Sequence, residues 1–300
     1  MTARATPVEQ ETQRQAPTPL WRRFPLYGYF AIVVNLTTWY FAWSRIDPFY
    51  RYTFFVLWFS FIITLDALVK LRRGSSLMTR APLKFAQMFL FSTVFWWIFE
   101  AFNVPIQNWH YIMDQPYSPL AYNLIATLNF TTVLPAVMEL SEFWTSFQAL
   151  RPRLPADAVG KQVTPAVAAR LIVIGVLCAI LPFIWPHQTF VLVWLSLAFL
   201  LDPLNNLLGR KSALAHLKAR DWRFFVAIPL AGLTCGFFWE MWNSQSLPKW
   251  RYTVPYVGFG KVFEMPILGY SGYLPFAVEL FALYQFLLTI TNQRDDALAF

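Results

Sequence analysis

The stretch that decides the fold is residues 236–284, GFFWEMWNSQSLPKWRYTVPYVGFGKVFEMPILGYSGYLPFAVELFALY. It holds two acids in apolar surroundings, Glu240 and Glu279, and the aromatic, proline-rich segment between them is too irregular to be one helix. An earlier stretch repeats this outline as FWWIFEAFN, NWHY and LPAVMELSEFW, with Glu100 and Glu139 at the matching places. We therefore expect a duplicated membrane protein with paired buried carboxylates.

The composition supports a membrane protein. Hydrophobic residues make up 57% of the 300 residues and charged residues 13%, and the mean hydropathy is +0.42, which is too apolar for an ordinary soluble domain. Eight apolar segments each come close to the ~20 residues that cross a bilayer. They are residues 26–45, 52–70, 84–104, 119–147, 166–185, 188–208, 222–243 and 268–291. The prediction is an all-α, polytopic integral membrane protein with about eight transmembrane helices.

The charged segments divide the chain. Residues 1–20 are polar and lack an apolar run, which predicts a disordered cytoplasmic tail. A first membrane repeat follows over 21–150, then a basic, proline-bearing linker over 151–165, a second repeat over 166–292 and a short cytoplasmic tail over 293–300. Of the 24 Lys and Arg residues, 19 lie in the two terminal segments and in the loops on the same side of the membrane, chiefly in the loops and the N-terminus, so the positive-inside rule places both termini in the cytoplasm. This distribution explains the net charge of +8 without a nucleic-acid partner.

The duplication can be checked residue by residue. Residues 57–68, LWFSFIITLDAL, match residues 193–204, VWLSLAFLLDPL, at a shift of 136 that aligns Asp66 with Asp202. At a shift of 140, Glu100, Asn103, Pro135 and Glu139 recur as Glu240, Asn243, Pro275 and Glu279. Trp109 and Tyr111 recur as Trp250 and Tyr252 at a shift of 141. Because each half has four spans, an even number, we expect two parallel four-helix repeats related by an axis along the membrane normal.

Acids within the spans are candidates for function, because a charged group near the bilayer centre is costly and faces a protein interior or a wet cavity. The alternative is that they are hydrogen-bonded links between helices. We interpret Glu100, Glu139, Glu240 and Glu279 as catalytic acids or bases. Asp66 and Asp202 lie nearer the cytoplasmic ends and form a second tier, for which helix pairing or contact with the basic loops is the expected role.

Other polar and aromatic residues accompany these acids. Asn103 and Asn243 follow Glu100 and Glu240 by three residues, on the same helix face. The connectors after these helices suit either an aromatic belt at the membrane interface or a lid over the acids. The lid interpretation adds Trp109, Tyr111, Trp250, Arg251 and Tyr252 to the substrate-binding residues.

Several site types find no support in the sequence. Cys178 and Cys235 fall in apolar segments, and His110, His187 and His216 are scattered, so no metal site is predicted. No phosphate-binding glycine loop and no nucleophile elbow is present in the sequence. We expect no cofactor.

Two resemblances bear on function. The motifs FWExxN, KWxY, FEMPILGY and GYLPF resemble an uncharacterised family of bacterial polytopic membrane proteins, which implies the bacterial inner membrane. In each half, an acid near a helix end, a Trp-x-Tyr element and LP followed by a Glu more distantly resemble the lycopene cyclase domains of heterodimeric and fused carotenoid cyclases. That resemblance implies intramembrane acid chemistry on a polyene, with Glu100, Glu139, Glu240 and Glu279 as acid and base.

The functional prediction is an intramembrane acid–base enzyme, cyclase- or isomerase-like, acting on a lipid-soluble isoprenoid or carotenoid-like substrate. Its partners are then that small molecule and membrane lipid. Two alternatives remain open: an ion-coupled membrane transporter, and a non-catalytic membrane subunit.

Overall fold

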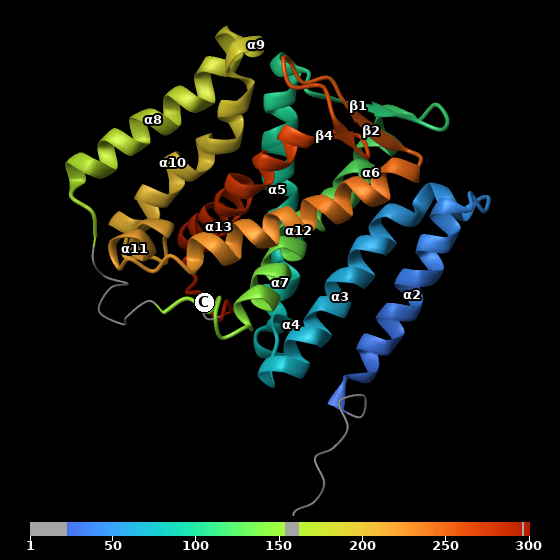
Figure 1. Ribbon diagram of the computed structural model, residues 1–300, viewed down its shortest axis with the longest axis horizontal. Coiled ribbons are helices and arrows are strands. Elements are labelled where there is room, and N and C mark those ends of the chain that lie inside the picture. Colours follow the sequence, from blue (N-terminus) through green and yellow to red (C-terminus); the bar gives the residue numbers. More distant parts are fainter. Residues whose placement is uncertain (1–22, 154–161, 296) are drawn as a thin grey trace, which may run out of the picture.

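The computed structural model describes residues 23–153, 162–295 and 297–300, and the chain in these ranges is mostly helical (Figure 1). The predicted tail over 1–20 and the greater part of the predicted linker over 151–165 lie outside the described residues. Seven helical segments of the described chain are long and apolar enough to cross a membrane. These segments give the protein the character of an integral membrane protein.

The first half of the chain supplies three of these segments. Its elements are α2 (Leu26–Trp43), η1 (Phe49–Tyr52), α3 (Thr53–Arg73), α4 (Leu77–Arg80), α5 (Pro82–Ile106), β1 (Trp109–Ile112), α6 (Pro119–Phe130) and α7 (Val133–Thr145). The first predicted span, α2, is a helix of 18 residues but is not among the seven segments. Its Tyr, Trp, Thr and Asn side chains lower its hydropathy.

The second half of the chain supplies the other four segments that are long and apolar enough to cross a membrane. Its elements are α8 (Pro165–Ile184), α9 (Pro186–Thr189), η2 (Phe190–Leu192), α10 (Val193–Leu207), α11 (Ala213–Lys218), α12 (Phe224–Gln245), β2 (Lys249–Tyr252), β3 (Lys261–Val262), β4 (Met265–Pro266), η3 (Ile267–Gly272) and α13 (Tyr273–Ile290). The spans predicted over 188–208 and 268–291 each begin with 3-10 turns before the long helix starts.

The span predicted as one helix over 119–147 is broken into α6 and α7 at Thr131 and Thr132. Pro135 has no N–H to donate to the carbonyl four residues earlier, which weakens a continuous helix at this point. Ser92 of α5 fills the gap, because its hydroxyl donates to the Phe130 carbonyl at 2.5 Å and accepts from the Leu134 N–H at 3.0 Å. A side chain from a neighbouring helix thus replaces the missing helical hydrogen bond.

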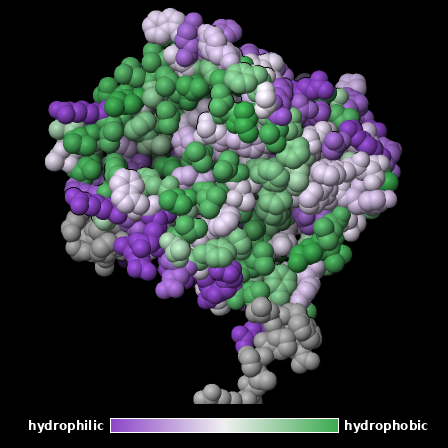
Figure 2. All heavy atoms as spheres, viewed as in Figure 1, coloured by the Kyte–Doolittle hydropathy of each residue, from purple (hydrophilic) through white to green (hydrophobic). Residues whose placement is uncertain are grey.

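The helices α7, α12 and α13 form the interior of the bundle. α7 packs against α3, α5 and α12, and α13 packs against α5, α10 and α12 (Figure 1). α2 and α8 lie on the outside, against α3 and α10 respectively, and expose many of their Leu, Val and Ile side chains. Figure 2 shows hydrophobic side chains over α8 and the middle of the bundle, with hydrophilic ones gathered towards its two ends. This is the distribution that a bilayer requires.

The connectors after α5 and α12 meet as a two-stranded antiparallel ribbon, β1 with β2, in which Trp109 faces Tyr252 and Tyr111 faces Trp250. The all-α prediction did not include these strands, because four residues are too few for a strand pattern to be recognised. Asn103 fixes the start of β1, since its Oδ1 accepts from Asn108 N at 2.8 Å and its Nδ2 donates to Trp109 O at 2.8 Å. In the second half, Asn243 binds both main-chain groups of Trp250, each at 2.9 Å. The β1–β2 ribbon therefore joins the two halves at one end of the bundle.

Candidate functional site: an aromatic cavity beneath the ribbon

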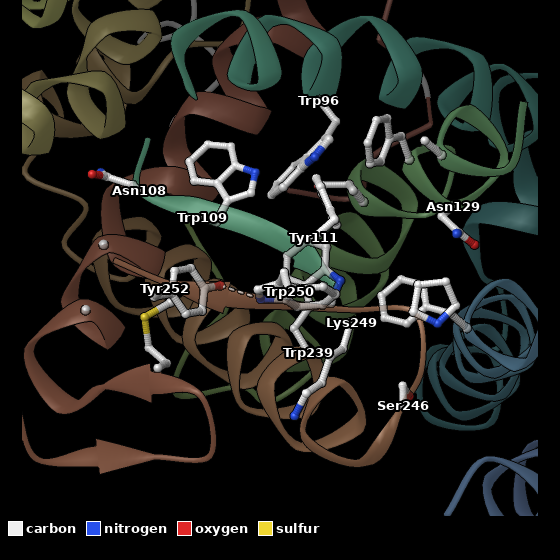
Figure 3. Close-up of a pocket in the computed structure, with 18 of the residues that line it drawn as sticks. Trp96, Asn108, Trp109, Tyr111, Asn129, Trp239, Ser246, Lys249, Trp250 and Tyr252 are labelled. Atoms are coloured by element: carbon white, nitrogen blue, oxygen red, sulfur yellow. Dashed lines mark hydrogen bonds between the residues drawn. The ribbon is translucent and has the colours of Figure 1, made fainter. Parts of the chain in front are cut away.

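A cavity of about 600 Å³ lies against the β1–β2 ribbon (Figure 3). Both halves of the chain contribute to it. The first half supplies the first turn of α3 and residues of α5 and α6, and the second half supplies the first turn of α10 and residues of α12 and η3. Its lining is dominated by aromatic rings: Tyr50, Tyr52, Phe54, Phe55, Trp96, Trp109, Tyr111, Tyr117, Tyr122, Phe130, Phe190, Trp194, Trp239, Trp250, Tyr252, Tyr273 and Phe276. Its size and apolar lining are typical of a site for a small organic molecule.

Glu100 of α5 lies directly behind this lining. Its Oε1 accepts three hydrogen bonds, from Trp96 Nε1 at 2.9 Å, Trp109 Nε1 at 3.1 Å and the Tyr111 hydroxyl at 2.6 Å. All three donors line the cavity. The carboxyl group is therefore connected to the cavity wall by three direct hydrogen bonds.

Glu240 of α12 has the matching position on the other strand and is fully buried. Its Oε1 accepts from the hydroxyls of Tyr252 at 2.7 Å and Tyr273 at 2.6 Å, and Trp250 Nε1 donates to the Tyr252 hydroxyl at 2.8 Å. Its Oε2 has no hydrogen-bond partner among the described residues. Each strand of the ribbon thus carries a Trp and a Tyr that are hydrogen-bonded, directly or through each other, to a glutamate.

The two donor sets differ at two positions. Trp109 donates to Glu100 itself, whereas Trp250 donates to the Tyr252 hydroxyl. Trp96 matches Gly236 at the shift of 140. A Cβ at Gly236 would lie 2.3 Å from the ring of Tyr273, so the absence of a side chain makes room for that ring. In place of an indole from the same helix, Glu240 therefore accepts from a phenol on the next helix, Tyr273 of α13.

The two ribbon tyrosines are hydrogen-bond donors. Burial raises the pKa of Tyr111 well above its ordinary value, and the neighbouring charge of Glu100 raises it further. Burial and then Glu240 raise the pKa of Tyr252 in the same way. Both side chains consequently keep their protons at neutral pH.

The other two glutamates lie away from the cavity lining. Glu279 of α13 is fully buried and its Oε1 accepts from the main-chain N–H of Leu197 in α10 at 2.9 Å. Glu139 of α7 is also fully buried, has Asp66 and Glu142 as charged neighbours, and neither of its oxygens has a hydrogen-bond partner among the described residues. The structure therefore separates the four predicted acids into two beside the cavity and two within the helix bundle.

Asp66 and Asp202 lie near the opposite end of the bundle. Asp66 accepts from the Ser76 hydroxyl and from Met78 N, each at 2.9 Å, at the start of α4. Asp202 accepts from the main-chain N–H groups of Ala213 at 2.7 Å and Leu214 at 2.9 Å, at the start of α11. Each carboxylate holds the short helix that follows its own long helix.

The remaining predicted residues have structural contacts. Asn103 and Asn243 hold the strands and do not line the cavity. The Arg251 side chain is 59% exposed and also lies outside the lining, with its Nε 3.9 Å from Glu264. Its neighbour Lys249, which the sequence did not single out, lines the cavity and pairs with Glu264 at 2.6 Å.

Sequence reasoning also missed Trp96, Trp194, Trp239, Tyr273 and Phe276 as lining residues. A signal was present for Trp96, which lies four residues before Glu100 and so on the same helix face. Tyr273 belongs to the GYLPF motif, yet only the fold shows that its hydroxyl reaches Glu240.

Comparison with protein-family models, with curated proteins and with solved structures finds no match to this chain.

Proposed function

We propose that the protein is an intramembrane acid–base enzyme that isomerises or cyclises a lipid-soluble isoprenoid or carotenoid-like substrate. The observation that carries this proposal is the cavity beneath the ribbon, whose lining side chains are hydrogen-bonded to the half-buried Glu100 and the buried Glu240. An apolar cavity of about 600 Å³ suits a hydrocarbon chain. The carboxyl groups supply the only chemistry that such a reaction needs.

The proposed reaction moves one proton in and one proton out. The protonated member of the Glu100 and Glu240 pair gives its proton to one carbon of a substrate double bond, through the hydroxyl of Tyr111 or Tyr252 acting as a relay. The π electrons form the new C–H bond and leave a carbocation on the other carbon. In cyclisation, a second double bond of the substrate attacks this cation and a carbon–carbon bond forms.

Loss of a proton then ends the reaction. A carboxylate accepts the proton from the carbon next to the cation, and the electrons of that C–H bond form the new double bond. The product is an isomer of the substrate, so the reaction needs no oxidant or reductant. The faces of Trp96, Trp109, Trp239 and Trp250 stabilise the cation electrostatically while it exists.

We further infer that the two halves are parallel four-helix repeats with α2 as an eighth transmembrane helix. The equivalent contacts of Asp66 and Asp202 and the symmetric register of the ribbon support this arrangement. The excess of Lys and Arg on one side favours cytoplasmic termini in a bacterial inner membrane. The cavity then opens near the outer leaflet, where a lipid-soluble substrate is available.

The test uses the purified protein in lipid nanodiscs, supplied with polyene isoprenoids in D₂O. The wild type should convert a polyene to an isomer that carries deuterium, detected by chromatography with mass spectrometry. Glu240→Gln and Glu100→Gln should each lower turnover by about 10²–10⁴-fold. Asp202→Asn, which alters a carboxylate far from the cavity, is the matched control.

Two outcomes would oppose the proposal. If the wild type leaves every polyene unchanged, the protein is not an enzyme of this kind. If proteoliposomes take up a solute in a pH-dependent way and Glu240→Gln abolishes that uptake, the transporter alternative is favoured. If the wild type and both Glu→Gln variants convert the polyene at the same rate, Glu100 and Glu240 are not the acid and base, although substrate binding by the cavity is not contradicted.

A further inference from the structure

The face of α6 that turns towards the cavity carries an amide group. The cavity is lined by residues of α6 that include Tyr122, Ile125, Ala126 and Asn129. Because these positions are three or four residues apart, they form one face of the helix. Leu120 and Leu124 lie on the opposite face and are 70% and 62% exposed, as side chains that meet lipid should be. Asn129 therefore belongs to the wall of the cavity, where Figure 3 shows it across the aromatic rings from Trp109.

The amide of Asn129 has no hydrogen-bond partner among the described residues, and its atoms are accessible. Its Nδ2 and Oδ1 bond to no described side chain or main-chain group, and neither belongs to the buried polar atoms that lack a partner, unlike both amide atoms of Asn108. The hydroxyls of Thr53, Ser246 and Ser271 also line the cavity, but each donates to a main-chain carbonyl at 2.6–2.9 Å. The Asn129 amide is thus a polar group of the wall that is able to bind a ligand.

The position of Asn129 makes an unused amide costly. It lies in the last turn of α6, inside a segment that is long and apolar enough to cross a membrane. An amide in apolar surroundings loses the hydrogen bonds that water would give it, which costs free energy unless a partner replaces them. A polar group of the substrate is such a partner, and a few polar groups of this kind fix the orientation of a ligand in an apolar site.

The second half of the chain offers no matching amide. Gly269 takes the place of Asn129 at the shift of 140, and a Cβ at Gly269 would lie 2.4 Å from Met265 Sδ. In the first half, the ring of Phe130, which follows Asn129, packs 5.9 Å from Trp96, a donor to Glu100. The cavity is accordingly unsymmetrical, with the free amide on the side of Glu100.

We propose that Asn129 binds the hydroxyl group of an isoprenoid alcohol whose hydrocarbon chain lies among the aromatic rings. The amide presents a donor at Nδ2 and an acceptor at Oδ1, and a hydroxyl both accepts and donates, so one hydroxyl satisfies both atoms. An ether or a ketone accepts only, and a hydrocarbon does neither. The hydroxyl end of the substrate then lies on the side of Glu100. This inference rests on the proposed function, because it names the substrate class of the same cavity.

The experiment compares three polyenes with the same isoprenoid skeleton: all-trans-retinol, its methyl ether and the corresponding hydrocarbon, axerophtene. The tryptophans around the cavity transfer excitation energy to a bound polyene, so the part of the signal that saturates in a titration of the full chain in nanodiscs gives a dissociation constant. The wild type should bind retinol about tenfold more tightly than either analogue. Asn129→Leu, which keeps the volume but removes both hydrogen-bonding atoms, should bind the three polyenes equally.

Two further variants complete the design. Asn123→Leu is the matched control, because Asn123 is an exposed amide of the same helix that does not line the cavity, and this variant should keep the preference for retinol. Asn129→Gln retains the amide one methylene further from the helix and should keep part of the preference that Asn129→Leu loses. These results together would assign the hydroxyl group to Asn129.

Other results would overturn the inference. Equal binding of the three polyenes by the wild type, or a preference that disappears in Asn123→Leu and survives in Asn129→Leu, would show that Asn129 does not bind a hydroxyl. A uniform loss of affinity for all three polyenes in Asn129→Leu would mean that its role is structural. If no polyene gives saturable energy transfer with the wild type, the proposed function itself is contradicted.

Discussion

At the scale of single residues, the site depends on how one carboxyl oxygen is surrounded. Glu240 Oε1 accepts from two tyrosine hydroxyls in an apolar interior, where hydrogen bonds to a charged or partly charged oxygen are strong. The second oxygen, without a partner, is the atom able to carry a proton. Removing one donor should therefore change the acidity of the group as well as its position.

Tyr273→Phe removes one of these donors and leaves the ring in place. We expect a loss of about 1–3 kcal/mol in stability and a lower turnover in the D₂O assay, because Glu240 retains Tyr252 alone. Thermal unfolding in detergent and product formation measure the two effects. Tyr122→Phe is the control, since Tyr122 lines the cavity and its hydroxyl has no hydrogen-bond partner among the described residues. Equal losses in both variants would contradict the role given to Tyr273.

The stability of the protein should depend on pH through His216. His216 of α11 lies outside the membrane segments, stacks on Phe224 at 4.2 Å and has Asp221 at 3.2 Å, with Lys211 as a further charged neighbour. Burial lowers the pKa of His216 below its ordinary value of 6.5, an effect that Asp221 partly opposes. The folded protein therefore binds the proton less readily than the unfolded chain.

Protonation and folding are linked, and this linkage fixes the direction in which the stability of the protein changes with pH. The stability that neutral His216 contributes is complete above pH 6.5 and is lost as the pH falls below that value towards the lowered pKa of the folded state. His216→Gln, which stays neutral, should show a smaller fall in unfolding temperature between pH 7 and pH 5. If the unfolding temperatures of the wild type and His216→Gln fall by the same amount between pH 7 and pH 5, His216 does not contribute to the pH dependence of stability.

At the scale of elements, the break between α6 and α7 shows what a sequence leaves open. The apolar character of residues 119–147 was enough to predict a membrane span, but the break depends on whether a neighbour supplies hydrogen bonds near Pro135. That neighbour is Ser92, 43 positions earlier in the chain than Pro135, which no local pattern connects to the break. The ribbon was missed for the same reason, because each strand is completed by the other half.

Ser92→Ala tests this bridge. The substitution leaves the Phe130 carbonyl and the Leu134 N–H without their shared partner in the interior, so stability should fall by about 1–3 kcal/mol. Ser141→Ala removes a hydroxyl that bonds only within its own helix, to Val137 O, and should have a much smaller effect. Equal unfolding temperatures for the two variants would mean that the bridge contributes nothing.

At the scale of the whole molecule, membrane character and the matched positions of the two halves follow from the sequence, whereas the grouping of the acids does not. Glu100 and Glu139 recur as a pair in the sequence, yet of the four acids only Glu100 and Glu240 are hydrogen-bonded to side chains that line the cavity. The depth and direction of each side chain decide this, and both depend on helix packing that periodicity cannot specify. Asn103 and Asn243 were noticed because they recur, but their contacts show that they hold strands.

The chain's last described residues tie the halves together at the end opposite the ribbon. Glu142 of α7 is fully buried between Arg73 at 3.4 Å and Arg80 at 3.0 Å, and it accepts from Ala299 N at 2.6 Å. Lys211 of the second half donates to the Leu298 carbonyl at 2.9 Å. The segment over 297–300 is thus recognised mainly through its main chain, by side chains from both halves.

Glu142→Gln should be strongly destabilising, by about 3–5 kcal/mol, because it leaves two arginines without their buried counter-charge. The unfolding temperature in detergent measures this loss. Asp47→Asn removes the partner of an exposed ion pair with Arg51 and should cost at most about 1 kcal/mol. A loss of similar size in both variants would show that Glu142 is not a structural centre.

The register of the ribbon has a consequence for assembly. Trp109 faces Tyr252 and Tyr111 faces Trp250, so exchanging each residue for its counterpart in the other half leaves the pairing unchanged. A contact that maps onto itself in this way is isologous, the geometry that joins the two copies in a twofold dimer. The β1–β2 ribbon therefore has the register that a twofold dimer interface would have, and a half-length protein with such a strand would need a second copy to pair it.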